Sequence, residues 1–152
     1  MKRNNWLVAG GLLSAAAALL HIAIIVGGPD WYRFFGAGER LARLAETGSP
    51  VPAFVTMGIA VVLSLWAAYA FSGAGIIGRL PLLRTALILI SAVYLLRGLV
   101  LFPALLLKPQ LVDGFTVWSS IIVLVFGVAY ALGTWAAWPN LARRAVGASG
   151  PA

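Results

Sequence analysis

The chain lacks cysteine, carries little charge and contains a single histidine. The absence of cysteine excludes disulfides, thiolate catalysis and cysteine-ligated metal sites. One histidine cannot form a metal site by itself, and it cannot supply both axial ligands of a haem. We therefore expect neither a metal nor a cofactor.

Acidic residues are the scarcest charged group, with 4 Asp and Glu against 11 Lys and Arg. None lies between Glu46 and Asp113, so the chain lacks the membrane-embedded carboxylate that proton-coupled exporters use. A Ser-His-acid arrangement could form only by borrowing Asp30 or Glu39 from a loop. These absences make an enzyme the least favoured class of function, and no catalytic residue is assigned.

Apolar residues are abundant instead. They make up 62% of the chain, whose mean hydropathy of +0.98 is too high for a domain with a polar surface. The formal net charge of +7 would be typical of a nucleic-acid-binding protein. However, the basic residues are scattered at the ends of apolar runs rather than gathered on one face. We expect a lipid bilayer as the partner and no nucleic acid.

Four apolar runs approach the length that crosses a bilayer, about 20 residues for about 30 Å of hydrocarbon. Glycines and prolines separate the runs, and Pro139 is expected to close the fourth. The sequence therefore predicts an all-α integral membrane protein, with residues 1–152 forming a single transmembrane domain that is a bundle of four transmembrane helices. The helices are expected over residues 6–26, 53–71, 85–107 and 116–138, followed by a flexible tail at 147–152.

The distribution of charge indicates how the bundle is oriented. All four acids fall on one side of the membrane, where they match the basic residues of that side. The other side has basic residues only, and such a side is usually cytoplasmic. We therefore expect both termini to be cytoplasmic, in a bacterial inner membrane. The acid-free basic residues are Lys2, Arg3, Arg79, Arg84, Arg143 and Arg144.

Residues 29–47, between the first two runs, have the pattern of a short amphipathic helix. Pro29 is a favoured first helical residue. Aromatic and small side chains from Trp31 to Ala45 share one face, and Arg33 lies off it. Such a helix lies in the membrane interface, although residues 36–38 could break it into two. It would form either a structural cover over the bundle mouth or a functional lid.

His21 and Arg97 are the strongly polar ionisable side chains within the apolar runs. Ionisable residues inside a membrane usually mark functional sites. Both are expected about 20 Å from the cytoplasmic ends of their helices, at 1.5 Å per residue, which places them in the outer half of the bundle. For His21 a hydrogen bond to a hydroxyl is the simpler interpretation, whereas for Arg97 we favour a function. The candidate ligand-binding residues are Arg97, His21, Tyr94, Glu39, Ser120, Ser119 and Thr56.

Three functions compete. The favoured hypothesis is a membrane-embedded binding or carrier protein for a lipidic, quinone-like or other amphipathic or anionic small molecule, with its pocket in the outer half of the bundle. The second is an accessory or oligomer-forming subunit of a membrane complex, either a homo-oligomer or a hetero-complex, whose small-residue stripes pack against other helices. The third is a membrane enzyme that acts on a lipidic substrate.

Overall fold

The computed structural model describes residues 4–146, and this part of the chain is helical with short connections. Four stretches are long and apolar enough to cross a membrane, and large apolar side chains such as Leu19, Phe54 and Trp135 are exposed on them. The chain is thus an all-α integral membrane protein in contact with a lipid bilayer, as predicted. The elements are α1 (Asn5–Gly27), α2 (Pro29–Phe34), α3 (Glu39–Glu46), α4 (Val51–Gly73), α5 (Leu83–Leu99), α6 (Leu101–Leu107), a short 3-10 turn (Pro109–Leu111) and α7 (Gly114–Val146). The tail expected at 147–152 lies outside the described residues.

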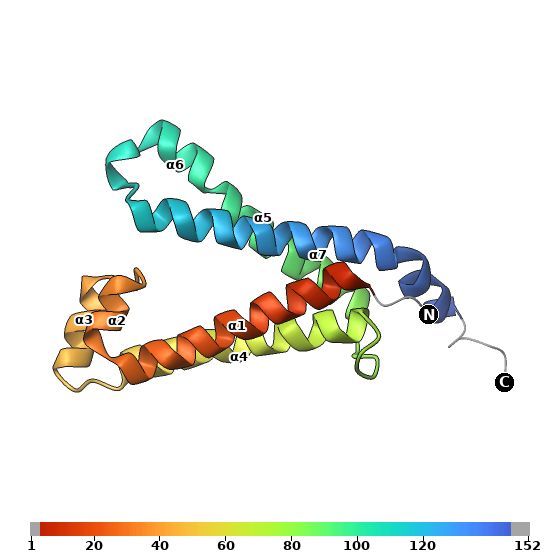
Figure 1. Cartoon of the computed structure of the whole chain (residues 1–152), viewed down its shortest axis with the longest axis horizontal. Coiled ribbons are helices and arrows are strands. Elements are labelled where there is room, and N and C mark those ends of the chain that lie inside the picture. The colour runs from red at the N-terminus through yellow and green to blue at the C-terminus, as the bar shows by residue number, and fades with distance from the viewer. Residues whose placement is uncertain (1–3, 147–152) are drawn as a thin grey trace.

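The membrane-spanning helices form two antiparallel pairs, α1 with α4 and α5 with α7, and α1 packs against α7 to join them. Figure 1 shows that the two pairs converge where α1 begins and diverge toward α2, α3 and α6. We call the converging end, where α4 and α7 finish and α5 starts, the basic end, because Arg79 and Arg84 lie there. The opposite end is called the open end.

All four spans meet at the basic end around Leu7, which is fully buried together with Leu87. Small residues permit this approach. A Cβ added to Gly133 of α7 would lie 2.9 Å from the backbone nitrogen of Leu7, and one added to Gly73 of α4 would lie 2.8 Å from a Leu7 methyl group. Asn4 adds a polar tie, because its side-chain Nδ2 donates to the carbonyl of Gly133 at 2.6 Å. The basic end is therefore closed by direct contact between helices.

The α5–α7 pair is equally close farther along. A Cβ at Gly98 would lie 2.9 Å from the Cα of Leu124, and a Cβ at Gly127 would lie 2.9 Å from the backbone nitrogen of Leu95. Each glycine thus faces the backbone of the opposite helix, and no larger residue fits without moving one of the two helices.

The third span covers Leu83–Leu107, close to the predicted 85–107, but it is not one regular helix. It is divided at Val100 into α5 and α6, and Figure 1 shows α6 leaning away from the rest of the bundle. Pro103 explains the break, because it has no N–H to donate to the carbonyl of Leu99 and its ring crowds that carbonyl.

The fourth span was expected to end at Pro139, but α7 continues through this proline to Val146. Pro139 removes a single hydrogen bond, to the carbonyl of Trp135, and a helix with tertiary support can absorb that loss as a bend. Figure 1 shows α7 turning near its C-terminal end. The stretch that is long and apolar enough to cross a membrane still ends at Pro139, and the helix itself continues beyond it.

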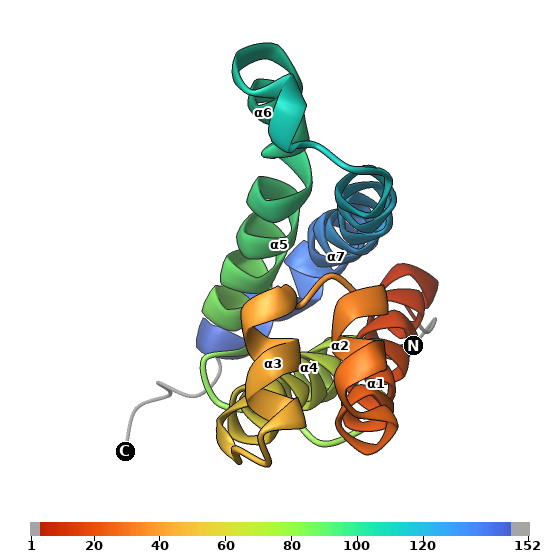
Figure 2. The same cartoon turned by 90° about the vertical axis from the view of Figure 1, so that its left-hand side faces the viewer.

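The segment between the first two spans folds as two short helices, α2 and α3, rather than as one continuous helix over 29–47. Gly36 and Gly38 adopt positive φ values of 69° and 92°, which explains the break. Figure 2 shows α2 and α3 side by side, running across the end of the α1–α4 pair. Tyr32 and Ala42 are buried against Ile24 of α1 in a small apolar cluster. The location of this segment in the membrane interface stays a prediction.

Candidate functional site

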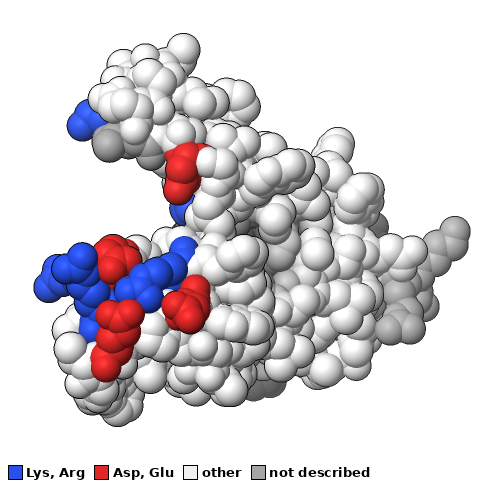
Figure 3. Space-filling model, turned by 60° about the vertical axis from the view of Figure 1, so that its left-hand side comes forward, with Lys and Arg blue, Asp and Glu red and all other residues white. Residues whose placement is uncertain are grey.

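A hollow separates the two helix pairs at the open end. Figure 3 shows it between a lobe rich in charged side chains of both signs and a second, largely uncharged lobe. In the described part of the chain, no Cα atom of α2 or α3 lies within 8 Å of a Cα atom of α5, α6 or α7. Gly36 lies against the ring of Phe115 at the start of α7, and this contact links the two lobes.

Arg97 and Ser120 are joined by a hydrogen bond in the half of the bundle toward the open end, from Nη1 of Arg97 to Oγ of Ser120 at 3.3 Å. Ser120 is 1% exposed, whereas Arg97 is exposed. The sequence placed these two residues together, and the structure does so across the α5–α7 pair. The bond is long and its acceptor is neutral, so it is a weak hydrogen bond. It uses one of the five N–H donors of the guanidinium.

No carboxylate approaches Arg97 among the residues that the structure describes. The ion pairs found there all join residues of α2 and α3. An arginine near the middle of a membrane costs about 2.5 to 3.5 kcal/mol on insertion scales, and such residues are usually paired. The remaining donors of Arg97 can therefore bind an anionic or strongly accepting group.

Tyr94 lies one helical turn from Arg97 but belongs to a different set of contacts. Its hydroxyl is hydrogen-bonded to Oγ of Ser14 at 2.9 Å, and the same Oγ is hydrogen-bonded to the hydroxyl of Tyr130 at 2.9 Å. Tyr130 also donates to the carbonyl of Trp66 at 3.0 Å. This hydroxyl network ties all four spans together at mid-membrane, and Ser14, Tyr94 and Tyr130 are buried at 0%, 5% and 0% exposure.

Aromatic rings surround the same tyrosine. The rings of Trp66, Phe126 and Tyr130 lie 4.8, 5.4 and 5.4 Å from that of Tyr94 between centroids, the first two edge-on. This packing and the satisfied hydroxyls make the cluster a closed floor beneath the Arg97–Ser120 pair. The contacts of Tyr94 are those of a core residue, and its role in ligand binding stays a prediction.

His21 is bound within its own helix. Its Nδ1 lies 2.7 Å from the carbonyl oxygen of Ala17, one turn earlier, and the ring is half-buried. A carbonyl can only accept, so Nδ1 donates in this hydrogen bond. Among the described residues no hydroxyl is hydrogen-bonded to His21, and a backbone carbonyl takes the place of the expected hydroxyl.

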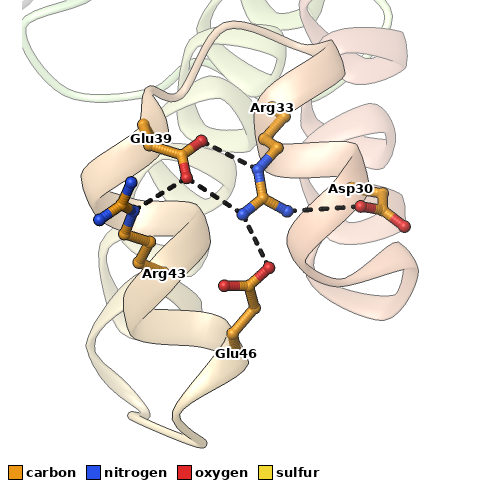
Figure 4. A network of polar contacts seen from close by, with 5 residues as sticks. All are labelled: Asp30, Arg33, Glu39, Arg43 and Glu46. Carbon is orange, nitrogen blue, oxygen red and sulfur yellow. Dashed lines mark hydrogen bonds and ion pairs between the residues drawn. The ribbon is translucent and has the colours of Figure 1, made fainter.

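Glu39 lies in an ion network between α2 and α3, which Figure 4 shows. Arg33 donates to Glu39 at 2.9 and 3.2 Å and to Glu46 at 2.7 Å, and it contacts Asp30 at 3.4 Å. Arg43 donates to Glu39 at 3.0 Å. Glu39 thus binds these two arginines of the α2–α3 segment.

These contacts fix the ionisation of both partners. Hydrogen bonds from Arg33 and Arg43 lower the pKa of Glu39 from 4.5 to about 2. The same bonds, with one to Glu46, hold the pKa of Arg33 above its usual range. Glu39 is therefore a carboxylate at neutral pH, which does not suit a general acid.

Ser119 and Thr56, the other predicted site residues, make no direct hydrogen bond to Arg97. Ser119 donates to the carbonyl of Thr116 in its own helix at 3.2 Å. Thr56 is 5% exposed on α4. Asp113 caps the start of α7 by accepting from the backbone and the hydroxyl of Thr116 at 2.8 and 2.6 Å, and these bonds lower the pKa of Asp113.

Ser14 and Tyr130 were not predicted as polar centres, because small residues at helical spacing, such as those around Ser14, are typical of faces that pack against other helices. The sequence did contain a signal for this pair. The hydroxyl of Ser14 lies on a helix face of small residues, and a glycine on that face leaves room for an aromatic ring of another helix. A Cβ at Gly10, on the same face as Ser14, would lie 2.9 Å from the ring of Tyr130. Small residues thus admit the tyrosine whose hydroxyl Ser14 binds.

The described residues contain no group of three His, Asp or Glu side chains that could hold a metal ion. Comparison of the chain with protein-family models, with curated proteins and with solved structures finds no match in any of the three sets.

Proposed function

We propose that this protein binds an amphipathic small molecule in the hollow between its helix pairs, with Arg97 and Ser120 holding the anionic or strongly accepting group of that molecule. The observation that carries the proposal is the exposed arginine within a span, which has one neutral hydrogen-bond partner in the described chain. A ligand acid or carbonyl would occupy the remaining donors, and arginine favours planar acceptors because its donors form a fork.

The apolar part of the ligand follows from the surroundings of this pair. The helices beside the hollow are apolar along their length, and the aromatic cluster around Tyr94 closes it toward the basic end. A molecule with an acidic or carbonyl head and an apolar body, such as a lipid or a quinone-like compound, matches both features. The role that fits is a binding or carrier protein.

The proposed orientation places both termini in the cytoplasm of a bacterial cell and the protein in its inner membrane. It is supported by Arg79 and Arg84 at the basic end and by all four acids at the open end. The hollow then opens to the outer side, with α2 and α3 in the outer interface. An impermeant thiol reagent should label Ser49→Cys and spare Gly78→Cys in intact cells, and the reverse pattern would contradict this orientation.

Substitution of Arg97 tests the binding function. Small molecules that remain bound to the purified protein would be identified by mass spectrometry for the wild type, Arg97→Leu, Arg97→Lys and the control Arg40→Gln, which removes an exposed arginine of α3. We expect Arg97→Leu to lose the bound molecule while it keeps its thermal stability, because no carboxylate is left without a partner. Arg97→Lys should retain part of the binding. If Arg97→Leu keeps both its stability and its ligand, the proposal is wrong.

A second candidate function is an accessory subunit whose hollow receives a transmembrane helix of a partner or of another copy. The observation that favours it is α6, which leans away from the bundle with Leu106 and Leu107 83% and 77% exposed. Gentle extraction followed by native mass spectrometry separates the two functions, because a stoichiometric protein complex would favour the subunit and a small-molecule adduct the carrier.

A further inference from the structure

The basic end carries positive charge without any acid. Arg79 and Arg84 lie there, and the sequence has no Asp or Glu between Glu46 and Asp113 or after Asp113. Both arginines are held in place by neutral groups. Nη2 of Arg79 donates to the carbonyl of Leu141 at 3.2 Å, and the guanidinium of Arg84 lies 3.7 Å from the ring centroid of Trp138. Each side chain thus has one contact with a neutral group, and no carboxylate of the described chain neutralises either arginine.

A hollow of about 570 Å³ lies between the two arginines, lined by residues 79–85 and Leu141. The start of α5 forms part of its wall, and no side chain caps the first N–H groups of this helix. Cationic side chains and backbone donors therefore border the same space. A phosphate accepts from both kinds of group, and the guanidinium fork matches its geometry.

Apolar side chains adjoin these charges. Leu82 is 79% exposed and adopts a φ of 52°, a left-handed conformation that is uncommon for a bulky residue. Ile76 and Ile77 of the same connection are 41% and 44% exposed. Apolar and basic side chains in one segment suit the boundary between lipid headgroups and acyl chains.

We propose that residues 79–85 bind the phosphate of an anionic phospholipid in the leaflet at the basic end. Arg79 and Arg84 donate to the phosphate oxygens, and Leu82 projects its side chain among the acyl chains. A free phosphate ion would use the arginines but would leave Leu82 in water, so the observations favour the lipid. This site is separate from the hollow at the open end and does not depend on a ligand there.

Lipid retention by the full-length protein tests the proposal. The protein would be equilibrated with equal amounts of phosphatidylglycerol and phosphatidylcholine, and the bound lipids would be counted by native mass spectrometry. The test variant is Arg79→Gln with Arg84→Gln. The matched control is Arg40→Gln with Lys108→Gln, which removes the same charge from two exposed residues of the open end.

We expect the wild type and the control to prefer phosphatidylglycerol by roughly 30-fold, the contribution of two basic side chains near an anionic surface. The test variant should lose this preference while its helical circular dichroism is unchanged. A wild type without preference, or a folded test variant that keeps it, would overturn the proposal.

Two further measurements cover misfolding and the source of the phosphate. Arg79→Lys with Arg84→Lys keeps both charges, and it should prefer phosphatidylglycerol less than the wild type because an ammonium cannot form the bidentate fork. Binding equal to that of the wild type would contradict direct guanidinium contact. Inorganic phosphate added to the lipid-free protein in detergent should leave its thermal stability unchanged. If phosphate stabilises the protein and displaces phosphatidylglycerol, the site binds a free anion and the lipid proposal is wrong.

Discussion

The two ends of this bundle differ in how their helices meet. At the basic end, glycines bring four helices into contact around Leu7. At the open end the pairs diverge, and the Arg97–Ser120 pair keeps one long hydrogen bond between its side chains. The comparison teaches that contacts between the two helix pairs are concentrated in one half of this small membrane protein, whereas the α5–α7 pair stays close beyond it. The other half can then expose polar groups without losing the fold.

The largest effect is expected where the basic end is tightest. Gly133→Ala places a methyl group 2.9 Å from the backbone nitrogen of Leu7. Overpacking of this kind costs about 1 to 3 kcal/mol of the free energy of unfolding. Gly58→Ala is the matched control, because nothing lies within 4 Å of a Cβ there, and it should be neutral or stabilising by up to about 1 kcal/mol. Thermal unfolding in detergent measures the stability of both variants. Equal melting temperatures for the two would show that the helices are not packed more tightly at Gly133 than at Gly58.

A smaller effect is expected from the hydroxyl network at mid-membrane. Ser14→Ala removes two hydrogen bonds, to Tyr94 and Tyr130, and should cost about 1 kcal/mol, at about 0.6 kcal/mol for each bond between membrane helices. Ser64→Ala is the control, because Oγ of Ser64 donates to Ala60 in its own helix. The two variants would be compared by unfolding in the same detergent. A Ser14→Ala protein as stable as Ser64→Ala would show that the network does not link the helix pairs.

The smallest effect is local to the open end and depends on pH. The pKa of Glu39 is lowered from 4.5 to about 2. Its ion pairs therefore stabilise the α2–α3 segment fully above pH 4.5, and this stabilisation is lost as the pH falls toward 2. We expect amide exchange of residues 29–47, corrected for its intrinsic rate, to accelerate over this window, while α1 and α7 near Leu7 stay protected. Unchanged protection of residues 29–47 at the lower pH would show that the network does not order α2 and α3.

The four spans could be predicted because a bilayer requires long apolar runs and the sequence contains them. Their internal breaks could not. Pro103 divides one helix and Pro139 lies within another without ending it, and a proline has the same sequence signal in both cases. The outcome depends on whether neighbouring helices support the residues beyond it.

The candidate site was predicted in part for a similar reason. Arg97 and Ser120 were identified because polar groups are rare in an apolar span, and they are in contact. The partners of Tyr94 were not identified, because these helices are apolar on all sides and their sequences do not show which faces meet. Glu39 was a candidate ligand-binding residue, and its carboxylate accepts hydrogen bonds from Arg33 and Arg43 of the same segment. Its role in ligand binding stays a prediction.

The proline break in the third span has a mechanical consequence. The carbonyl of Leu99 receives no hydrogen bond from Pro103, so the span has its weakest point near Val100, where α5 gives way to α6. We expect α6 to move more than α5, because the glycine contact at Gly98 holds α5 close to α7. We expect spin labels on α6 and α3 to give a broader distance distribution than labels on the basic ends of α4 and α5, and Pro103→Ala to narrow it. The width of the outer hollow would then be set by this single break.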